Sequence, residues 1–352
     1  MTDSESATPP RQNGSFDTKN ESFSGKMCGQ VVGLGVETEE VGDGKGLVSQ
    51  VFESRILFKD SSPSLAVIVK IPQVFEDDVF GDPDVQTCTF TKAHLSTNHN
   101  RECEFYRDFA PRLRIPLGKV FRADKWILGE ERGAIVMESF IGRAKSGCFF
   151  EGFTVDQLYA LAGHLAEFNV NFLTAEDKSW VEKYPNAMWD QMDVVNHFIT
   201  PMIERLKALD SDEFRDHLKQ IDHLIYDPEF HRFTSSGVQE ALQMPAVLCH
   251  GDMWTNNILW TTTAEGAPSA ALAAIIDWQI IHKNTPAFDF ARLLTIGTSG
   301  DIRRLHKDKI LEFYYTSFAS STRWEAVTRA NASGIPTIIG SLREQKWLSK
   351  TP

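Results

Sequence analysis

The densest group of polar residues in the chain is the run His250-Gly251-Asp252-Met253-Trp254-Thr255-Asn256-Asn257. It follows the apolar segment AVLC and leads into the apolar segment ILW, a pattern that indicates a turn between two strands. An aspartate on such a turn can accept a proton from a hydroxyl group, and an asparagine five residues later can bind a metal ion. The spacing is therefore typical of a phosphoryl-transfer loop with Asp252 as its base. The structural alternative is a polar hairpin whose Asp and Asn only satisfy the turn backbone.

A second carboxylate, Asp277, ends the apolar run Ala273–Ile276 and stands 25 residues after Asp252. Carboxylate and amide oxygens are ligands that suit Mg²⁺, which binds one or two carboxylates together with substrate phosphates. Asp277 and Asn257 are therefore the candidate metal ligands. An aspartate that only caps the next turn is the alternative for Asp277 alone, but the order and spacing of both elements favour a metal site.

Lys70 lies inside the β-branched segment VIVKI. A lysine in such a strand must reach water, form an ion pair or point into a cleft. The α- and β-phosphates of a nucleotide would satisfy it, with Glu102 or Glu104 of the following helical segment as an ion-pair partner. An edge-strand lysine in water is the alternative.

Three glycines, Gly42, Gly44 and Gly46, precede the apolar segment that begins near Ser49. Closely spaced glycines before a strand allow backbone amides to approach phosphates, although a simple hairpin turn has the same composition. The chain contains neither GxGxxG nor GxxxxGK[ST], which disfavours a dinucleotide-binding fold and a P-loop. It also lacks GxSxG and HExxH, which disfavours the common hydrolase types.

The elements that must position these residues change character along the chain. Apolar and β-branched runs indicate strands in the first part, and helical spacing dominates from Thr154, a candidate N-cap, onward. This order predicts two lobes with a cleft between them. The predicted strands include 65–72 and 133–140, and the predicted helices include 99–113, 154–173, 191–209, 212–226 and 307–318.

Composition narrows the class of protein. The 352 residues carry a net charge of −12, which argues against nucleic-acid and anionic-membrane partners. Five scattered cysteines without a CxxC pair disfavour a zinc site or a disulfide framework. The polar start has no apolar core of a signal peptide, and no run of 18 apolar residues occurs. We therefore expect a cytoplasmic protein, and the sequence does not indicate its oligomeric state.

In this combination and order, the motifs resemble the aminoglycoside phosphotransferase and choline kinase superfamily. Within it, the chain looks most similar to the CHK-kinase-like group, which includes the ecdysteroid-kinase-like proteins and many nematode kinases of unknown substrate. The resemblance covers about residues 29–320. It is carried by the segments GDGKGLVSQVF, AVIVKIP, HNRECEFYRDFAPRL, VMESF, CHGDMWTNNILW, AIIDWQ and PAFDFARLL.

The resemblance implies an α+β, bilobal, protein-kinase-like fold with a small β-rich N-lobe and a larger, mainly helical C-lobe. The implied division is a disordered tail at 1–27, a nucleotide-binding N-lobe at 28–138, a C-lobe at 139–320 and a divergent C-terminal tail at 321–352. Relatives often carry a histidine where this chain has Asn169, so we expect a substrate-side contact to differ there.

The resemblance also implies the role of each site residue, with ATP and Mg²⁺ as cofactors. Asp252 would act as the catalytic base beside His250, which would brace the loop, and Asn257 and Asp277 would hold Mg²⁺. Asp289 would anchor the start of a helix. The implied nucleotide contacts are Gly44, Gly46, Ser49, Lys70, its partner Glu102, and the backbone groups of Met137, Glu138 and Phe140 around adenine.

The expected function is transfer of the γ-phosphate of ATP to a hydroxyl group of a small molecule, such as a steroid, a xenobiotic or a choline-like alcohol. Trp180, Trp189 and Trp254 could line a pocket for an apolar acceptor, or they could belong to the core. The alternative function is that of a catalytically inactive, kinase-like binding or interaction protein. HGD and DWQ stand where protein kinases have HRD and DFG, which disfavours a protein kinase.

Overall fold

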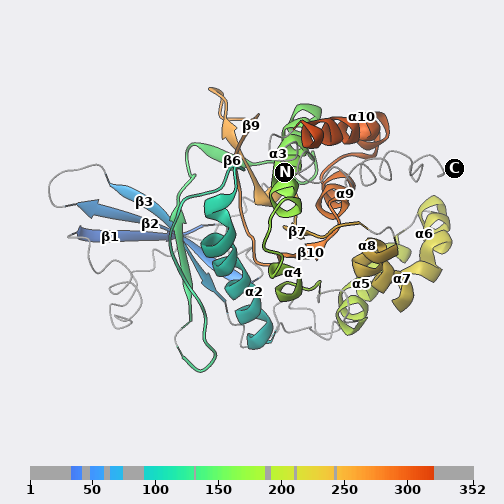
Figure 1. Cartoon of the computed structure of the whole chain (residues 1–352), viewed down its shortest axis with the longest axis horizontal. Coiled ribbons are helices and arrows are strands. Elements are labelled where there is room, and N and C mark those ends of the chain that lie inside the picture. Colours follow the sequence, from blue (N-terminus) through green and yellow to red (C-terminus); the bar gives the residue numbers. More distant parts are fainter. Residues whose placement is uncertain are drawn as a thin grey trace, which may run out of the picture.

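The computed structural model describes the chain over residues 33–41, 48–58, 64–73, 91–130, 132–186, 192–209, 212–241 and 244–320. Within these ranges the fold is α+β, as expected, with a β-sheet in the N-terminal part and mainly helices in the C-terminal part (Figure 1). The tails expected at 1–27 and 321–352 lie outside the described residues, as do Gly44 and Gly46.

The N-terminal sheet has five antiparallel strands in the order β1-β2-β3-β5-β4. The predicted strand 65–72 is confirmed as β3, and it pairs with both β2 and β5. Lys70 stands opposite Val51 on one side and Ile135 on the other. Paired residues in antiparallel strands point their side chains to the same face, so these three share one face of the sheet. The strands are β1 (Gly33–Glu40), β2 (Ser49–Phe58), β3 (Leu65–Pro72), β4 (Val120–Asp124) and β5 (Ala134–Glu138).

The helix α2 (Lys92–Glu104) lies beside this sheet (Figure 1). It begins earlier than the predicted segment 99–113, because the Thr91 side chain accepts a hydrogen bond from the His94 N–H at 3.2 Å and caps the helix. A π-helical turn, Phe105–Phe109, and a 3₁₀ turn, Ala110–Arg112, continue it. The first and last residues of the π-turn are buried, as their apolar spacing predicted.

The C-terminal part is built on α3 (Val155–Leu173), which starts where the sequence predicted. Thr154 and Gln157 form a reciprocal capping box at its N-terminus. The helix α10 (Gly300–Ala319) packs along α3, and α3 in turn packs on the strands β7 (Val247–Cys249) and β9 (Pro268–Ile275) that flank the polar motifs. The other helices are α4 (Trp180–Lys183), α5 (Met192–Lys207), α6 (Asp212–Ile225), α7 (Pro228–Arg232), α8 (Val238–Ala241) and α9 (Ala287–Ile296), with a π-turn at Phe233–Gly237.

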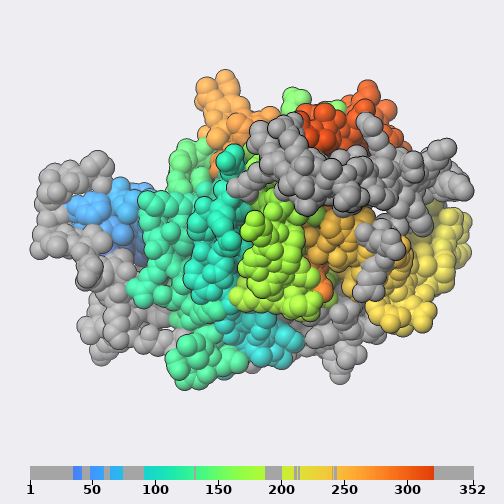
Figure 2. All heavy atoms as spheres, in the orientation of Figure 1, coloured from blue at the N-terminus to red at the C-terminus, as the bar shows by residue number. Residues whose placement is uncertain are grey.

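Helices α5 to α8 form the end of the molecule opposite to strands β1 to β3 (Figures 1 and 2). The motif residues lie between these two ends, on loops joined to short strands. The strands are β6 (Ala144–Ser146), β7 (Val247–Cys249), β8 (Ile258–Thr262), β9 (Pro268–Ile275) and β10 (His282–Asn284). Across the described ranges, we find no helix with the length and apolar character needed to span a membrane.

Candidate active site

Lys70 joins the two parts of the fold. Its Nζ donates a hydrogen bond to Glu102 Oε2 at 2.6 Å and to Asp277 Oδ1 at 2.5 Å. Glu102, on the last turn of α2, is only 1 % exposed. The lysine in the apolar strand, the glutamate of the helix and the aspartate after β9 therefore form one ion-pair group. The sequence offered Glu102 as a partner of Lys70, but it did not indicate that Asp277 also pairs with this lysine.

Electrostatics keep Lys70 charged. Burial disfavours the ammonium form, but the carboxylates of Asp277 and Glu102 outweigh burial and raise the pKa of Lys70 above its ordinary value. A charged lysine at this place can bind the oxygens of a phosphate group.

Asp277 is held at the start of a short loop by an unusual backbone conformation. Its φ is +68°, and it is the non-glycine residue with a positive φ in the described chain. The next residue, Trp278, anchors the loop: its ring stacks on Phe105 at 3.8 Å between centroids and 5° between planes, and its Nε1–H donates to the Ile275 carbonyl at 3.0 Å. The strain at Asp277 thus accompanies firm packing around it, a combination found at functional sites.

Asp252 lies on the loop between β7 and β8, and each of its carboxylate oxygens has a partner. Asn257 Nδ2 donates to Oδ2 at 3.0 Å and to the Asp252 backbone carbonyl at 2.9 Å. A guanidinium nitrogen of Arg292, on α9, donates to Oδ1. Because the Asn257 amide nitrogen faces Asp252, its amide oxygen is the atom that can bind a metal ion.

The loop of Asp252 and the loop of Asp277 lie against each other. The Ile276 N–H donates to the Asn257 carbonyl at 3.0 Å, and Ile258 pairs with Ile275 across β8 and β9. Asn257 and Asp277 are therefore neighbours and offer hard oxygen ligands. This donor set fits Mg²⁺, which takes few protein ligands and leaves positions for phosphate oxygens and water.

His250 is fully buried, and both of its ring nitrogens are engaged with backbone groups. Nδ1 accepts the Asp252 N–H at 3.1 Å, so Nε2 carries the proton and donates to the Ile276 carbonyl at 2.9 Å. The ring also contacts Trp278 edge-on, with centroids 4.5 Å apart. This geometry suits the bracing role suggested for His250 and ties the loop of Asp252 to that of Asp277.

Asp289, on the first turn of α9, holds the same loop from the other side. Its Oδ2 accepts the His250 N–H at 2.7 Å, and its Oδ1 accepts the Gly251 N–H at 2.9 Å. Asp289 is 3 % exposed. Its carboxylate binds backbone amides of this loop, and so it does more than anchor the start of its own helix. The sequence suggested a structural role for Asp289 but did not show that the loop of Asp252 is its partner.

Gly251 allows the tight turn before Asp252. Its φ is +88°, and a Cβ at this position would lie 2.7 Å from the Ile280 carbonyl oxygen and 3.0 Å from the His282 ring. Burial lowers the pKa of His282 below its ordinary value, so this ring is neutral near pH 7.

The other nucleotide-side residues lie along the sheet. Ser49 is buried at the start of β2, opposite Pro72, and therefore shares a sheet face with Lys70. Met137 is buried on β5 opposite Ile68 and lies on the same face. Two groups of the segment that follows are used within the protein: the Glu138 N–H donates to the Lys119 carbonyl at 2.8 Å, and the Phe140 carbonyl accepts from the Arg143 and Ala144 amides at 3.1 and 2.9 Å.

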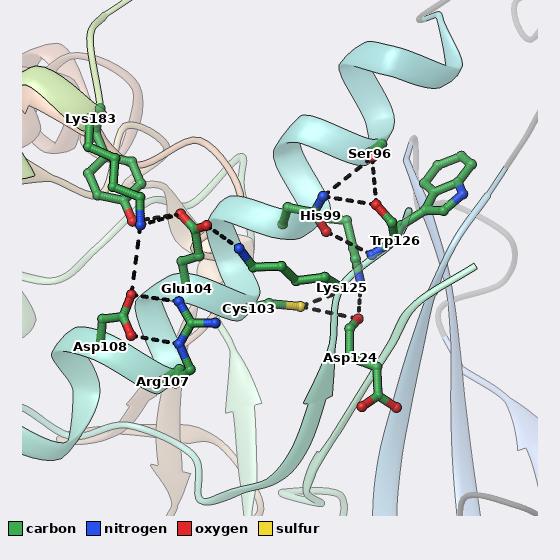
Figure 3. Close-up of polar contacts among 12 residues, drawn as sticks. Ser96, His99, Cys103, Glu104, Arg107, Asp108, Asp124, Lys125, Trp126 and Lys183 are labelled. Atoms are coloured by element: carbon green, nitrogen blue, oxygen red, sulfur yellow. Dashed lines mark hydrogen bonds and ion pairs between the residues drawn. The ribbon is translucent and has the colours of Figure 1, made fainter. Parts of the chain in front are cut away.

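Glu104, the other candidate partner of Lys70, has a different place. Its Oε2 accepts from the Tyr184 hydroxyl at 2.7 Å and from Lys183 Nζ at 3.0 Å, and its Oε1 accepts from Lys125 (Figure 3). Burial raises the pKa of Glu104, but the three donors outweigh burial and hold its pKa below the ordinary value. The cluster fastens the end of α2 to the segment at α4.

The structure places the remaining residues that the sequence analysis singled out. Asn169 is buried in the C-terminal core and donates to the Tyr314 hydroxyl at 2.7 Å. Trp180 is also a core residue, and its ring packs on Phe172 with centroids 5.2 Å apart. Trp254 is half-buried beside Phe149, and Trp189 lies outside the described residues. Arg292 was missed, although it directly follows the Phe-Ala pair after Asp289.

Two curated proteins of Caenorhabditis elegans are similar in sequence to this chain. The curated protein "Uncharacterized oxidoreductase dhs-27" of Caenorhabditis elegans is 28 % identical over 224 residues, which are 63 % of this chain and 27 % of that protein. The "Uncharacterized kinase-like protein D1044.1" of the same organism is 28 % identical over 258 residues, 72 % of this chain and 65 % of that protein. The chain thus spans about a quarter of the length of the first relative and just under two thirds of the length of the second.

Solved structures with a similar arrangement include the GDP complex of aminoglycoside 2′-phosphotransferase-IIIa, with a TM-score of 0.46, 14 % identity and coverage of 92 % of this chain and 95 % of that one. A microcompartment-associated aminopropanol kinase has a TM-score of 0.41 and 11 % identity, with coverage of 83 % and 78 %. Likeness at this level transfers no function to the chain.

The match to a protein family is more extensive and runs through every motif described above. The DUF1679 family, described as "Uncharacterized oxidoreductase dhs-27", matches residues 32–327. This span includes Lys70, Glu102, Asp252, Asn257 and Asp277. The chain belongs to the DUF1679 family.

Proposed function

We propose that the chain is an ATP- and Mg²⁺-dependent kinase that transfers the γ-phosphate to a hydroxyl group of a small molecule. The observation that carries the proposal is the convergence of three separate segments: Lys70 bridges Glu102 and Asp277, and the loop of Asp252 lies against that of Asp277. A phosphate-binding lysine, a metal ligand and a hydroxyl-activating carboxylate are the parts that phosphoryl transfer requires.

Each residue has a physical task in this proposal. Lys70 binds the α- and β-phosphates, and Glu102 holds the lysine in place. Asp252 orients the acceptor hydroxyl and accepts its proton. Asn257 and Asp277 hold Mg²⁺, which when bound neutralises phosphate charge. Little covalent chemistry is asked of the protein, so positioning and charge neutralisation supply most of the rate.

The nucleotide base would lie near the end of β5. Because the Phe140 carbonyl is used within its own turn, its N–H is the group that can serve a purine ring. The buried side chains of Met137 and Ser49 lie on the sheet face that carries Lys70. The acceptor we propose is an alcohol of the steroid, xenobiotic or choline-like classes, in keeping with the CHK-kinase-like resemblance.

The family description suggests an oxidoreductase as another possibility, and the fold argues against it for this chain. Nicotinamide-dependent oxidoreductases bind their dinucleotide at the carboxyl ends of parallel strands. Every strand pair in the described ranges is antiparallel. The relative that is named an oxidoreductase also extends well beyond the matched 27 % of its length.

A thermal-shift titration with ATP, with and without Mg²⁺, tests the nucleotide site. Ligand at 100 times Kd should stabilise the folded protein by about 2.7 kcal/mol, a shift of several degrees. Asp277→Asn should abolish the Mg²⁺-dependent part of the shift. Asp301→Asn, at a side chain that is 85 % exposed on α10, is the matched control and should behave as wild type.

A panel of alcohols with ATP then tests transfer, with the phosphorylated product identified by mass spectrometry. Absence of any shift in folded wild-type protein would contradict the kinase proposal. A shift without phosphorylation of any acceptor would favour the alternative, an inactive kinase-like binding protein.

A further inference from the structure

Arg292 places a positive charge next to Asp252, the proposed base, although it comes from a distant part of the chain. The run from His250 to Asn257 has no lysine or arginine. Arg292 reaches the loop from α9, 40 residues after Asp252, and donates from Nη2 to Asp252 Oδ1. The packing of α9 on the loop therefore places a permanent positive charge beside the carboxylate.

Arg292 and Asn257, one of the proposed metal ligands, donate hydrogen bonds to different carboxylate oxygens of Asp252. Asn257 Nδ2 donates to Oδ2 at 3.0 Å, and Asn257 lies beside the loop of Asp277, the other proposed metal ligand. Arg292 binds the other oxygen, Oδ1. The guanidinium is thus bound to the carboxylate oxygen of Asp252 that Asn257 does not use.

The guanidinium retains donors for a ligand. Arginine has five N–H groups, and Asp252 uses one nitrogen of Arg292. Its Nε is buried and has no hydrogen-bond partner within the described part of the chain. The side chain remains 33 % exposed, so it is not sealed in the core.

We propose that Arg292 is a further catalytic residue, which binds the phosphoryl group as it passes from nucleotide to acceptor. This proposal rests on the kinase function proposed above. In the step, the acceptor O–H gives its proton to Asp252, and the oxygen forms a bond to the γ-phosphorus. The bond from this phosphorus to the bridging oxygen breaks, and its electron pair leaves with ADP. Negative charge on the equatorial phosphoryl oxygens then lies within reach of the guanidinium.

A transition-state analogue separates this role from a merely structural one without requiring the acceptor. Mg²⁺-ADP binding is measured by calorimetry with and without aluminium fluoride, which occupies the place of the transferring phosphoryl group. Such analogues bind at least ~100-fold more tightly than ground-state ligands. We expect wild-type protein to gain affinity for ADP by about this factor when aluminium fluoride is present.

Arg292→Ala should lose ~10- to 100-fold of that gain and keep the affinity for ADP alone within about twofold, because in this proposal the guanidinium binds Asp252 and the transferring group but not ADP. Arg292→Lys, which keeps the charge but not the planar fork, should retain part of the gain. Arg304→Ala is the matched control: Arg304 also pairs with an aspartate, Asp301, but on the exposed surface of α10. It should keep the full gain.

The outcomes distinguish the two proposals. If wild-type protein does not bind Mg²⁺-ADP, the kinase function itself fails. If wild-type protein binds ADP and gains affinity from aluminium fluoride, but Arg292→Ala gains as much, the kinase function stands and the role of Arg292 is wrong. If wild-type protein binds ADP but gains no affinity from aluminium fluoride, the proposed role of Arg292 is also wrong. Thermal or urea unfolding shows whether Arg292→Ala is folded. If it is not, the test uses Arg292→Lys: a gain from aluminium fluoride as large as that of wild type would then contradict the role of Arg292.

Discussion

The Tyr184 hydroxyl donates a hydrogen bond to Glu104 Oε2 at 2.7 Å and so joins the end of α2 to the segment that follows α4. Glu102, two residues earlier, pairs with Lys70 at the proposed active site. The Tyr184 carbonyl also accepts the Lys283 N–H at 2.7 Å on β10, the strand that pairs with β7 before the catalytic loop. One tyrosine therefore links the helix of the ion pair to the strands that carry the proposed base.

This link predicts a measurable stability contribution. Tyr184→Phe should lower the free energy of unfolding by about 1.5–3 kcal/mol, because the hydroxyl donates to a charged carboxylate. Urea unfolding measures the change. Lys183→Ala, which removes a half-exposed donor to the same carboxylate, should change stability by less than about 1 kcal/mol. Equal effects of the two substitutions would contradict a special role of the tyrosine.

The same cluster predicts a pH dependence. The folded-state pKa of Glu104 lies below its ordinary value of 4.5, so the unfolded state binds a proton more readily. The stabilisation by this carboxylate is therefore complete above about pH 5 and is lost as the pH falls below 4.5 through the folded-state pKa. The stability difference between wild type and Glu104→Gln should be largest near pH 6 and shrink toward pH 3. A difference independent of pH would contradict the charged state of Glu104.

Local sequence patterns were sufficient to predict that Lys70 needs a polar partner, because a lysine in a β-branched strand must form an ion pair or reach a cleft. The structure supplies Glu102, which was one of the two candidates, and Asp277, which the sequence did not offer as a partner. Glu102 and Glu104 could not be separated by spacing alone. The two glutamates are two positions apart in the helix, so their side chains point about 200° apart around its axis. The rotation of the helix relative to the sheet therefore decides which of them reaches Lys70.

Contacts that depend on packing between distant segments were not predictable in this way. Arg292 and Asp289 both reach the catalytic loop from α9, 38 to 40 residues further along the chain. Nothing in the local pattern of α9 shows which of its faces lies against that loop. The partner of Asn169 was not predictable either, because the Tyr314 hydroxyl comes from the packing of α10 on α3.

The carboxylate of Asp289 should be essential for the shape of the catalytic loop. In Asp289→Asn one oxygen becomes an NH₂ group, which cannot accept the buried amide of His250 or Gly251. An unsatisfied buried amide lowers stability by about 1–3 kcal/mol, and urea unfolding should show a loss in this range. Asp301→Asn, on the surface, should stay within about 0.5 kcal/mol of wild type. If Asp289→Asn matched that control, the loop would not depend on this carboxylate.

The buried ring of His99 predicts a loss of stability in mild acid. Burial, assisted by the nearby charge of Lys70, outweighs the hydrogen bond to the Asp124 carbonyl and lowers the pKa of His99 below 6.5. The unfolded state therefore binds the proton more readily, and stability falls as the pH drops below 6.5. His99→Gln should be less stable than wild type at pH 7.5 but lose less stability between pH 7 and 5. His94→Gln, exposed on the same helix, should keep the wild-type slope.

The turn before Asp252 offers a test with a closely matched control. Gly251 and Gly266 have nearly the same backbone angle, with φ of +88° and +80°, so a Cβ adds about 1–2 kcal/mol of strain at either position. At Gly251 the Cβ would also meet the Ile280 carbonyl at 2.7 Å, whereas at Gly266 the nearest atom is the end of the Lys145 side chain at 3.9 Å. Gly251→Ala should therefore destabilise the protein clearly more than Gly266→Ala in urea unfolding. It should also displace Asp252 and weaken the aluminium fluoride gain that Gly266→Ala leaves intact. If both variants lost the same amount of stability, the loop would be able to move aside at Gly251. The close approach to the Ile280 carbonyl would then not hold Asp252 in place.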